Sequence, residues 1–454
     1  MCLKIKSYVG RDPSVFLFIY TLFAMAFKFK HVLIILFILS YILGSALVGH
    51  KHKEHYLSSD GEGYYLYLPA VFIYKTFENI LVNTPDQYKP YPNTNKIATR
   101  FTYGVALMEL PFFLISQASR YFQNLPLDSA YSNDMCVLVL IASCFYSILG
   151  LYFIYQLLIE KFSKTVVYFT LAALYLGTNL FWYTIREPAM SHSYSFFLVS
   201  VLLYKTNTLF KTKPSVKAIL GVSIVLALIT LIRPVNGILY LLIPFYGVAS
   251  LRDFKDRMAW IIGNKLHFFL PSTLLIVFLP QMYYWHYLSG KWLLNTYALL
   301  HEQSFNWSNP HLWDVFFSIH NGFFVYTPMM ILALFGLLMM VFKREENGVL
   351  FLILFSILAF ICACWFMWWF GHSVGFRPFI DFYPLLVGGL AYFLSFTFAK
   401  NKYLKYATQL VVLTLILVNI RILITPFYWD VQPSENGVND FNQLVEWVLD
   451  WTKW

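Results

Sequence analysis

Charged residues are scarce in this sequence. Asp, Glu, Lys and Arg make up 12% of its 454 residues, while 59% of the residues are hydrophobic and 20% are aromatic. A soluble globule of this length needs more charge to cover its surface. The composition therefore excludes an ordinary soluble protein and indicates an integral membrane protein, in which aromatic side chains collect at the two bilayer interfaces.

The sequence also lacks the usual marks of metal and nucleotide chemistry. Its five cysteines show no zinc or disulfide spacing. Four of them lie inside apolar runs, which favours core positions: Cys136, Cys144, Cys362 and Cys364. No Gly-rich dinucleotide fingerprint is present. The net charge of +10 is spread between apolar runs, so membrane topology explains it better than nucleic-acid binding.

About eleven apolar runs are long enough for spanning helices, which need roughly 17–25 residues. The runs are residues 32–49, 135–157, 166–182, 193–210, 217–232, 237–251, 266–283, 323–342, 349–368, 379–398 and 404–424. The run 237–251 is short for a span. The stretch 104–115 contains Glu109 and Pro111, and we expect it to form a helix in the outer leaflet.

If the chain crosses the membrane eleven times, the clusters of basic residues between these runs all lie on the same side. These clusters are Lys28 with Lys30, Lys161 with Lys164, Lys205 with Lys211 and Lys213, Arg252 with Lys255 and Arg257, Lys343 with Arg344, and Lys400 with Lys402 and Lys405. The positive-inside rule assigns that side to the cytoplasm. The opposite side receives a large outer loop at 50–134, a second at 284–321 and the tail 425–454. Residues 1–30 are cytoplasmic or interfacial, and residues 1–454 form one predicted domain.

Several ionisable residues map to the outer ends of the predicted spans: Arg186, Glu187, His192, Arg233, His372 and Arg377. Such residues cost roughly 2.5–3.5 kcal/mol at membrane depth, so their placement is informative. Arginine binds phosphate through paired hydrogen bonds, which makes the arginines candidates for holding a lipid phosphate. Each could equally anchor its helix at the interface, and Arg377 could pair with Asp381 at i+4.

The outer loop 50–134 opens with two carboxylates, Asp60 and Glu62, each followed by a glycine. Glycine permits sharp turns and close approach of a substrate. A carboxylate held there can act as a general base toward an acceptor hydroxyl. In the structural alternative, Asp60 caps the following helix and Glu62 adds a favourable charge to its first turn. The spacing alone does not separate the two interpretations.

In combination these features resemble the GT-C integral membrane glycosyltransferases, which include protein O-mannosyltransferases and the aminoarabinose transferases that modify lipid A. The resemblance covers about residues 31–400. Its marks, in chain order, are 60–65, the basic hairpin 160–164, the turn 231–234, the segment 322–328 and the segment 371–377. The resemblance implies an all-α polytopic membrane fold with about 11 transmembrane helices and amphipathic helices in the first outer loop.

The resemblance also implies a function. A sugar would pass with inversion from a polyprenyl-phosphate donor to a hydroxyl of a lipid, glycan or protein acceptor, with Asp60 as the base. Gly61 separates Glu62 from Asp60, whereas the family usually has an adjacent acidic pair, so Glu62 is a candidate for catalysis, for metal binding or for neither. Some members use a divalent metal, and no ligand set here identifies one. Membrane lipids are expected partners and nucleic acid is not.

The implied location is a bacterial inner membrane, with the active site facing the periplasm or the exterior. Two other functions stay open. A lipid-linked sugar flippase or transporter would place charged groups along a central path, and the cytoplasmic halves of the predicted spans have almost none. An O-antigen polymerase or ligase would usually carry its large functional loop late in the chain. The early outer loop 50–134 therefore favours the transferase.

Overall fold

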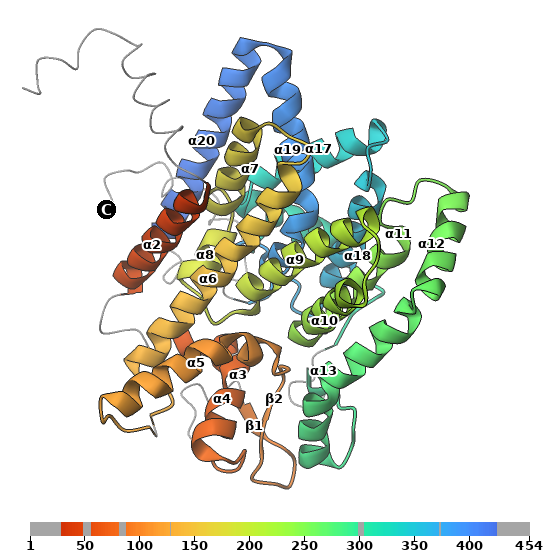
Figure 1. The fold of residues 1–454 in the computed structure, drawn as a ribbon. Coiled ribbons are helices and arrows are strands. Elements are labelled where there is room, and N and C mark those ends of the chain that lie inside the picture. The colour runs from red at the N-terminus through yellow and green to blue at the C-terminus, as the bar shows by residue number, and fades with distance from the viewer. Residues whose placement is uncertain are drawn as a thin grey trace, which may run out of the picture.

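The computed structural model describes residues 29–48, 56–80, 88–127, 129–297, 304–371 and 374–424. Within these ranges the chain is mostly helical, with one two-stranded antiparallel sheet (Figure 1). The expected interfacial N-terminus, the outer tail 425–454 and His372 lie outside the described residues.

Apolar helices run side by side through the body of the molecule (Figure 1). A helix or a broken pair of helices lies at every predicted span: α2 (Phe29–Val48), α6 (Asn133–Leu158), α7 (Lys164–Leu176) with α8 (Leu180–Ile185), α9 (Ser191–Lys211), α10 (Val216–Ile232), η4 (Pro234–Leu241) with α11 (Leu242–Phe245), α13 (Leu266–Ser289), α16 (Phe323–Tyr326) with α17 (Met329–Phe342), α18 (Gly348–Ala363), η5 (Arg377–Phe382) with α19 (Tyr383–Lys400), and α20 (Lys402–Ile424).

Five helices in the described ranges are long and apolar enough to cross a membrane: Phe29–Leu47, Asn133–Leu158, Leu266–Ser289, Arg377–Lys400 and Lys402–Ile422. Shorter apolar helices accompany them, among them Val216–Ile232 and Gly348–Ala363. This is the architecture of a polytopic all-α membrane protein, as the composition indicates.

The run predicted at 237–251 differs from the structure. Its helical part is η4 followed by α11, which ends at Phe245. A further helix, α12 (Leu251–Gly263), starts at a capping box in which Ser250 and Asp253 bond each other's backbone. The sequence analysis identified residues 252–257 only as a basic connection between spans. The capping box that starts the helix was not recognised among these charged residues.

Loops predicted to share the basic side do lie together. Lys161, between α6 and α7, is 3.0 Å from Glu346, between α17 and α18. Lys211, at the end of α9, is 2.7 Å from Glu160. The backbone N–H of Gly247 donates to Asn347 Oδ1 at 2.6 Å. The alternation of basic clusters therefore grouped these loops correctly at one end of the bundle.

The described residues of the predicted outer loop 50–134 form a separate layer, which we call the outer layer, at the opposite end of the bundle (Figure 1). Its elements are α3 (Ser59–Tyr65), α4 (Tyr67–Pro69), η2 (Ala70–Tyr74), β1 (Tyr88–Pro90), β2 (Ile97–Thr99) and α5 (Gly104–Phe122). Thr102 Oγ1 donates to the Leu231 carbonyl, next to the end of α10. The N–H of Thr99 donates to Tyr284 Oη of α13 at 3.3 Å. These bonds fix the layer to the ends of two bundle helices.

Glycines allow the closest approach between bundle helices. A Cβ atom added to Gly336 of α17 would overlap the carbonyl oxygen of Gly389 in α19. A Cβ on Gly389 would in turn overlap the Ala333 carbonyl oxygen of α17. The two helices thus touch backbone to backbone, which small residues permit in membrane bundles. This contact supports η5, which leads directly into α19 and carries Arg377.

Candidate active site

Asp60 lies in the first turn of α3 and is held by two arginines from distant parts of the chain. Arg100 Nη2 donates to Asp60 Oδ1 at 2.7 Å. Arg377 Nη2 donates to Asp60 Oδ2 at 2.8 Å. The Asp60 side chain is 16% exposed. We refer to Asp60, Arg100 and Arg377 as the Asp60 cluster.

The helix-capping interpretation of Asp60 does not fit this geometry. Helix α3 begins at Ser59, so Asp60 is its second residue, and each of its carboxylate oxygens binds a guanidinium. The neighbouring glycines do not form a sharp turn either. A Cβ on Gly61 would lie 2.7 Å from the Ala189 Cβ, and one on Gly63 would lie 2.6 Å from the Phe101 ring. Their small size lets α3 pack closely beneath the site.

Opposing effects act on the pKa of Asp60. Burial favours the neutral acid and raises the pKa, but the charges of Arg377 and Arg100 and their hydrogen bonds outweigh burial and hold it below the usual value. Asp60 is therefore an ionised carboxylate at neutral pH. Because two guanidiniums face one carboxylate, the Asp60 cluster keeps one positive charge in excess.

Glu187 adds a second carboxyl group at the edge of the Asp60 cluster. Its Oε1 accepts a hydrogen bond from Trp182 Nε1 at 2.9 Å, and its charge interacts with those of Arg377 and Asp60. Burial raises the pKa of Glu187, an effect that Arg377 and the Trp182 bond only partly counter. Protonation of Glu187 is thus easier than that of Asp60.

Arg233 and His192 belong to a second buried cluster. His192 Nδ1 lies 2.9 Å from Asp381 Oδ1 and 3.2 Å from Arg233 Nη1. Asn236 Nδ2 donates to Asp381 Oδ2 at 2.7 Å, and Arg233 Nη1 lies 3.7 Å from the same oxygen. We call these four residues the Asp381 cluster.

The alternative pairing of Arg377 with Asp381 is not what the structure shows. Residues 377–382 form the 3-10 helix η5, in which side chains at i and i+3 align and those at i and i+4 diverge. Arg377 therefore turns to Asp60, while Asp381 turns to His192 and Asn236.

The other predicted site residues lie apart from these contacts. Glu62 is fully buried, and residues two apart on a helix do not share a face. Glu62 lies instead beside Tyr88 and Tyr131. Burial raises the pKa of both tyrosines, and the charge of Glu62 raises it further. The Arg186 guanidinium lies 5.4 Å from the centre of the Trp182 ring. Among the described residues, no group of three or more His, Cys, Asp or Glu could hold a metal ion.

Three residues of these clusters were missed as site residues: Arg100, Asn236 and Asp381. Arg100 directly follows a short strand and precedes Phe101, over whose ring its guanidinium lies at 5.0 Å. An arginine in the same outer loop as Asp60 was the available signal. Asp381 was considered in the sequence only as a possible partner of Arg377. Asn236 was not identified as a site residue because it carries no charge.

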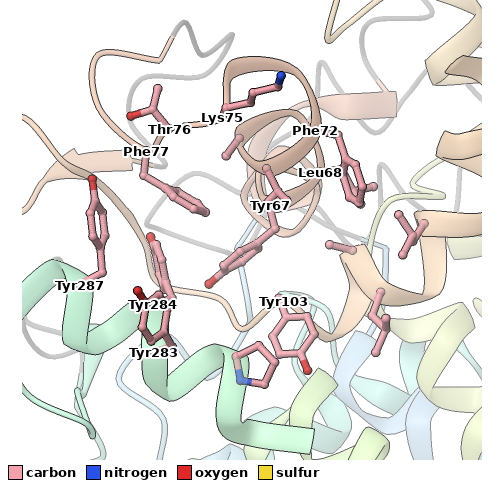
Figure 2. Close-up of a pocket in the computed structure, with 16 residues that line it drawn as sticks. Tyr67, Leu68, Phe72, Lys75, Thr76, Phe77, Tyr103, Tyr283, Tyr284 and Tyr287 are labelled. Atoms are coloured by element: carbon pink, nitrogen blue, oxygen red, sulfur yellow. The ribbon is translucent and has the colours of Figure 1, made fainter.

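An apolar pocket of about 590 Å³ opens between η2, α5 and the end of α13. Figure 2 shows the rings of Tyr67, Phe77 and Tyr284 gathered on one side and Lys75 at the rim, with its amine directed away. Tyr67 Oη donates to the Phe101 carbonyl at 2.7 Å, and Phe101 directly follows Arg100 of the Asp60 cluster.

Comparisons with known proteins support the fold. No protein-family model matches the sequence, and no curated protein matches it. The structure is similar to the crystal structure of ArnT from Cupriavidus metallidurans bound to undecaprenyl phosphate, with a TM-score of 0.52 and 11% sequence identity. The match covers 93% of this chain and 69% of that chain. The expected fold is thereby confirmed, and the protein is a polytopic all-α membrane protein with a fold similar to that of ArnT.

Proposed function

We propose that the protein is a membrane glycosyltransferase that moves a sugar from a polyprenyl-phosphate donor to an acceptor hydroxyl, with Asp60 as the general base. The observation that carries the proposal is the Asp60 cluster, in which an ionised carboxylate and two arginines meet in one place. The Asp60 cluster therefore combines a general base with an anion-binding site. The GT-C fold supports the proposal, as does the undecaprenyl phosphate bound to the similar ArnT.

The charges suit the donor. A sugar joined to a polyprenyl monophosphate is a phosphodiester with one negative charge, which matches the single excess positive charge of the Asp60 cluster. When the bond to the sugar breaks, the departing phosphate gains further negative charge. Guanidiniums already in place stabilise such developing charge without reorganisation.

The proposed reaction is a single displacement. Asp60 takes the proton of the acceptor hydroxyl, and the hydroxyl oxygen forms a bond to the anomeric carbon. The bond between that carbon and the phosphate oxygen breaks, and its electron pair leaves with the lipid phosphate. The products are the glycosylated acceptor, the lipid phosphate and protonated Asp60. No step of this reaction is routed through a metal or a nucleotide.

Asp60 can act as a base while it is paired with the arginines. Each of its oxygens accepts one hydrogen bond from a guanidinium and keeps a lone pair that can accept the proton of a hydroxyl. The pocket of Figure 2 is lined mostly by apolar side chains at the end of α13, and in this proposal it holds part of the hydrocarbon chain of the donor.

The test replaces Asp60 with Asn, which retains size but not basicity. We expect Asp60→Asn to lower transfer from a synthetic polyprenyl-phosphate sugar by about 10²–10⁴-fold, the usual effect of removing a general base. Binding of the same donor should persist or tighten, because the variant leaves both arginines without their carboxylate.

Asp134→Asn is the matched control. Asp134 also pairs with an arginine of the outer layer, Arg120, at 2.8 Å, but lies outside the Asp60 cluster. We expect this variant to transfer at nearly the normal rate. Normal transfer by Asp60→Asn would remove Asp60 from the mechanism, and absence of donor binding in the unaltered protein would remove the donor class.

A further inference from the structure

The three arginines near the candidate site are held in two different ways. Arg100 and Arg377 share Asp60, the residue proposed to take the proton. Arg233 is instead paired with Asp381, which also contacts His192 and Asn236. The difference matters because Asp60 takes a proton in the proposed reaction and thereby loses the charge that pairs it with Arg100 and Arg377, whereas nothing in the proposed reaction disturbs Asp381.

The Asp381 cluster is more deeply buried than the Asp60 cluster. Asp381 is 0% exposed and His192 is 3% exposed, and Asn236 is 1% exposed. The Arg233 side chain, at 16%, is the most exposed of the four. A buried carboxylate is costly unless charge and hydrogen bonds compensate it. Here one guanidinium supplies the charge and two neutral side chains supply the hydrogen bonds.

Hydrogen-bond chemistry fixes the roles inside the Asp381 cluster. The 2.9 Å contact between His192 Nδ1 and Asp381 Oδ1 requires a hydrogen between them, which places it on Nδ1. The same nitrogen then has no lone pair for the Arg233 hydrogen 3.2 Å away. The attraction that holds Arg233 is therefore its charge interaction with Asp381, and His192 and Asn236 orient the carboxylate.

Arg233 also faces the Asp60 cluster. Tyr64 and Tyr297 lie close enough to both Arg233 and Asp60 for electrostatic interaction. Tyr64 Oη further donates to Ser191 Oγ at 3.3 Å, beside His192. The Arg233 guanidinium is thus paired with a buried carboxylate and shares two tyrosine neighbours with Asp60.

We propose that Asp381, oriented by His192 and Asn236, is a positioning residue that fixes the Arg233 guanidinium as a permanent anion-binding group beside the Asp60 cluster. Arg233 would hold the donor phosphate throughout turnover, while Arg100 and Arg377 lose their charged partner when Asp60 takes the proton. This inference rests on the proposed function, because it assigns Arg233 to the anionic group of the donor.

A double-mutant cycle tests the proposal. Farnesyl phosphate, a short polyprenyl phosphate without a sugar, is titrated against purified protein in nanodiscs for the unaltered chain, Asp381→Asn, Arg233→Gln and the double variant. We expect Asp381→Asn to weaken binding by about 10- to 100-fold, the effect typical of removing a residue that orients a ligand-binding group. Adding it to Arg233→Gln should weaken binding no further, because Asp381 acts only through Arg233.

The outcomes separate this proposal from the proposed function. Absence of farnesyl phosphate binding by the unaltered protein would refute the donor class itself. Normal binding by Asp381→Asn, or losses that multiply in the double variant, would overturn the positioning role alone. If Asp381→Asn does not accumulate as folded protein, Asp381→Glu replaces it. That variant keeps the charge but displaces the guanidinium, so unaltered binding would again contradict the proposal.

Discussion

At the scale of single residues, the Asp60 cluster combines two requirements that oppose each other. A general base must accept a proton, yet two arginines keep Asp60 ionised and hydrogen-bonded. The ordinary pKa of an aspartate is 3.8, and that of Asp60 lies lower. A group with a depressed pKa keeps its charge above that pKa and loses it only as the pH falls through it. Asp60 should therefore stay charged across the whole physiological range.

Removing one arginine should change this pH dependence. In Arg100→Gln, burial still raises the pKa of Asp60, but only Arg377 opposes it, so the pKa must rise. We expect the residual transfer rate of this variant to fall with acid at a higher pH than in the unaltered protein. A profile of kcat/KM between pH 4 and pH 8 measures the shift.

Arg120→Gln serves as the control for the pH profile. It removes an arginine from the outer layer and breaks an ion pair with Asp134, but it leaves the Asp60 cluster intact. Its acid limb should match that of the unaltered protein. If Arg100→Gln and Arg120→Gln give the same profile, Arg100 does not control the ionisation of Asp60.

The residues of the site could be predicted only in part from the sequence. Arg233 and Arg377 were selected because charge at the end of an apolar run is costly and hence informative. Asp60 was selected because two carboxylates, each followed by a glycine, open the loop 50–134. The pairing of these residues could not be predicted, because Arg100 is 40 positions from Asp60 and Arg377 is 317 positions from it. Such contacts depend on how the helices pack, which hydrophobic periodicity does not encode.

At the scale of elements, the apolar runs predicted the helices well because spanning length and composition are strong constraints. They failed where a helix was short or polar. Helix α12 has a capping box but a charged surface, and α3 contains two glycines that sequence reading assigned to a turn. In α3 the glycines instead serve packing against Ala189 and Phe101, a reason that exists only in the tertiary structure.

The crossing of α17 and α19 gives a prediction at this scale. Gly389→Ala should destabilise the protein by about 1–3 kcal/mol, the usual cost of overpacking, because its new Cβ would overlap the backbone of α17. The neighbouring Gly388→Ala is the matched control, since a Cβ there meets nothing within 4 Å. Thermal unfolding of the two purified variants in detergent measures the difference. Equal unfolding temperatures would mean that the crossing tolerates a methyl group.

At the scale of the whole molecule, the structure groups the loops into two ends. The positive-inside rule predicts that the basic end faces the cytoplasm. Four native cysteines, Cys136, Cys144, Cys362 and Cys364, are buried, which favours labelling of introduced cysteines once Cys2 is replaced.

An impermeant thiol reagent should test this orientation. Asn95→Cys and Ser308→Cys place exposed thiols on the predicted outer side, and Lys213→Cys and Lys343→Cys place them on the basic side. We expect labelling from outside intact cells at the first two positions, and at the last two only after the membrane is opened. The reverse pattern would invert the topology and move the Asp60 cluster to the cytoplasmic face.

The spacing of the Asp60 cluster along the chain bears on biosynthesis. Translation proceeds from the N-terminus, so Asp60 and Arg100 emerge together with the first outer loop, while Arg377 follows only after most of the helices have been made. During that interval the nascent chain carries a carboxylate and one guanidinium, which neutralise each other. The excess positive charge that would attract a lipid phosphate arises when η5 docks. The order of synthesis thus keeps the site incomplete until the bundle around it is nearly finished.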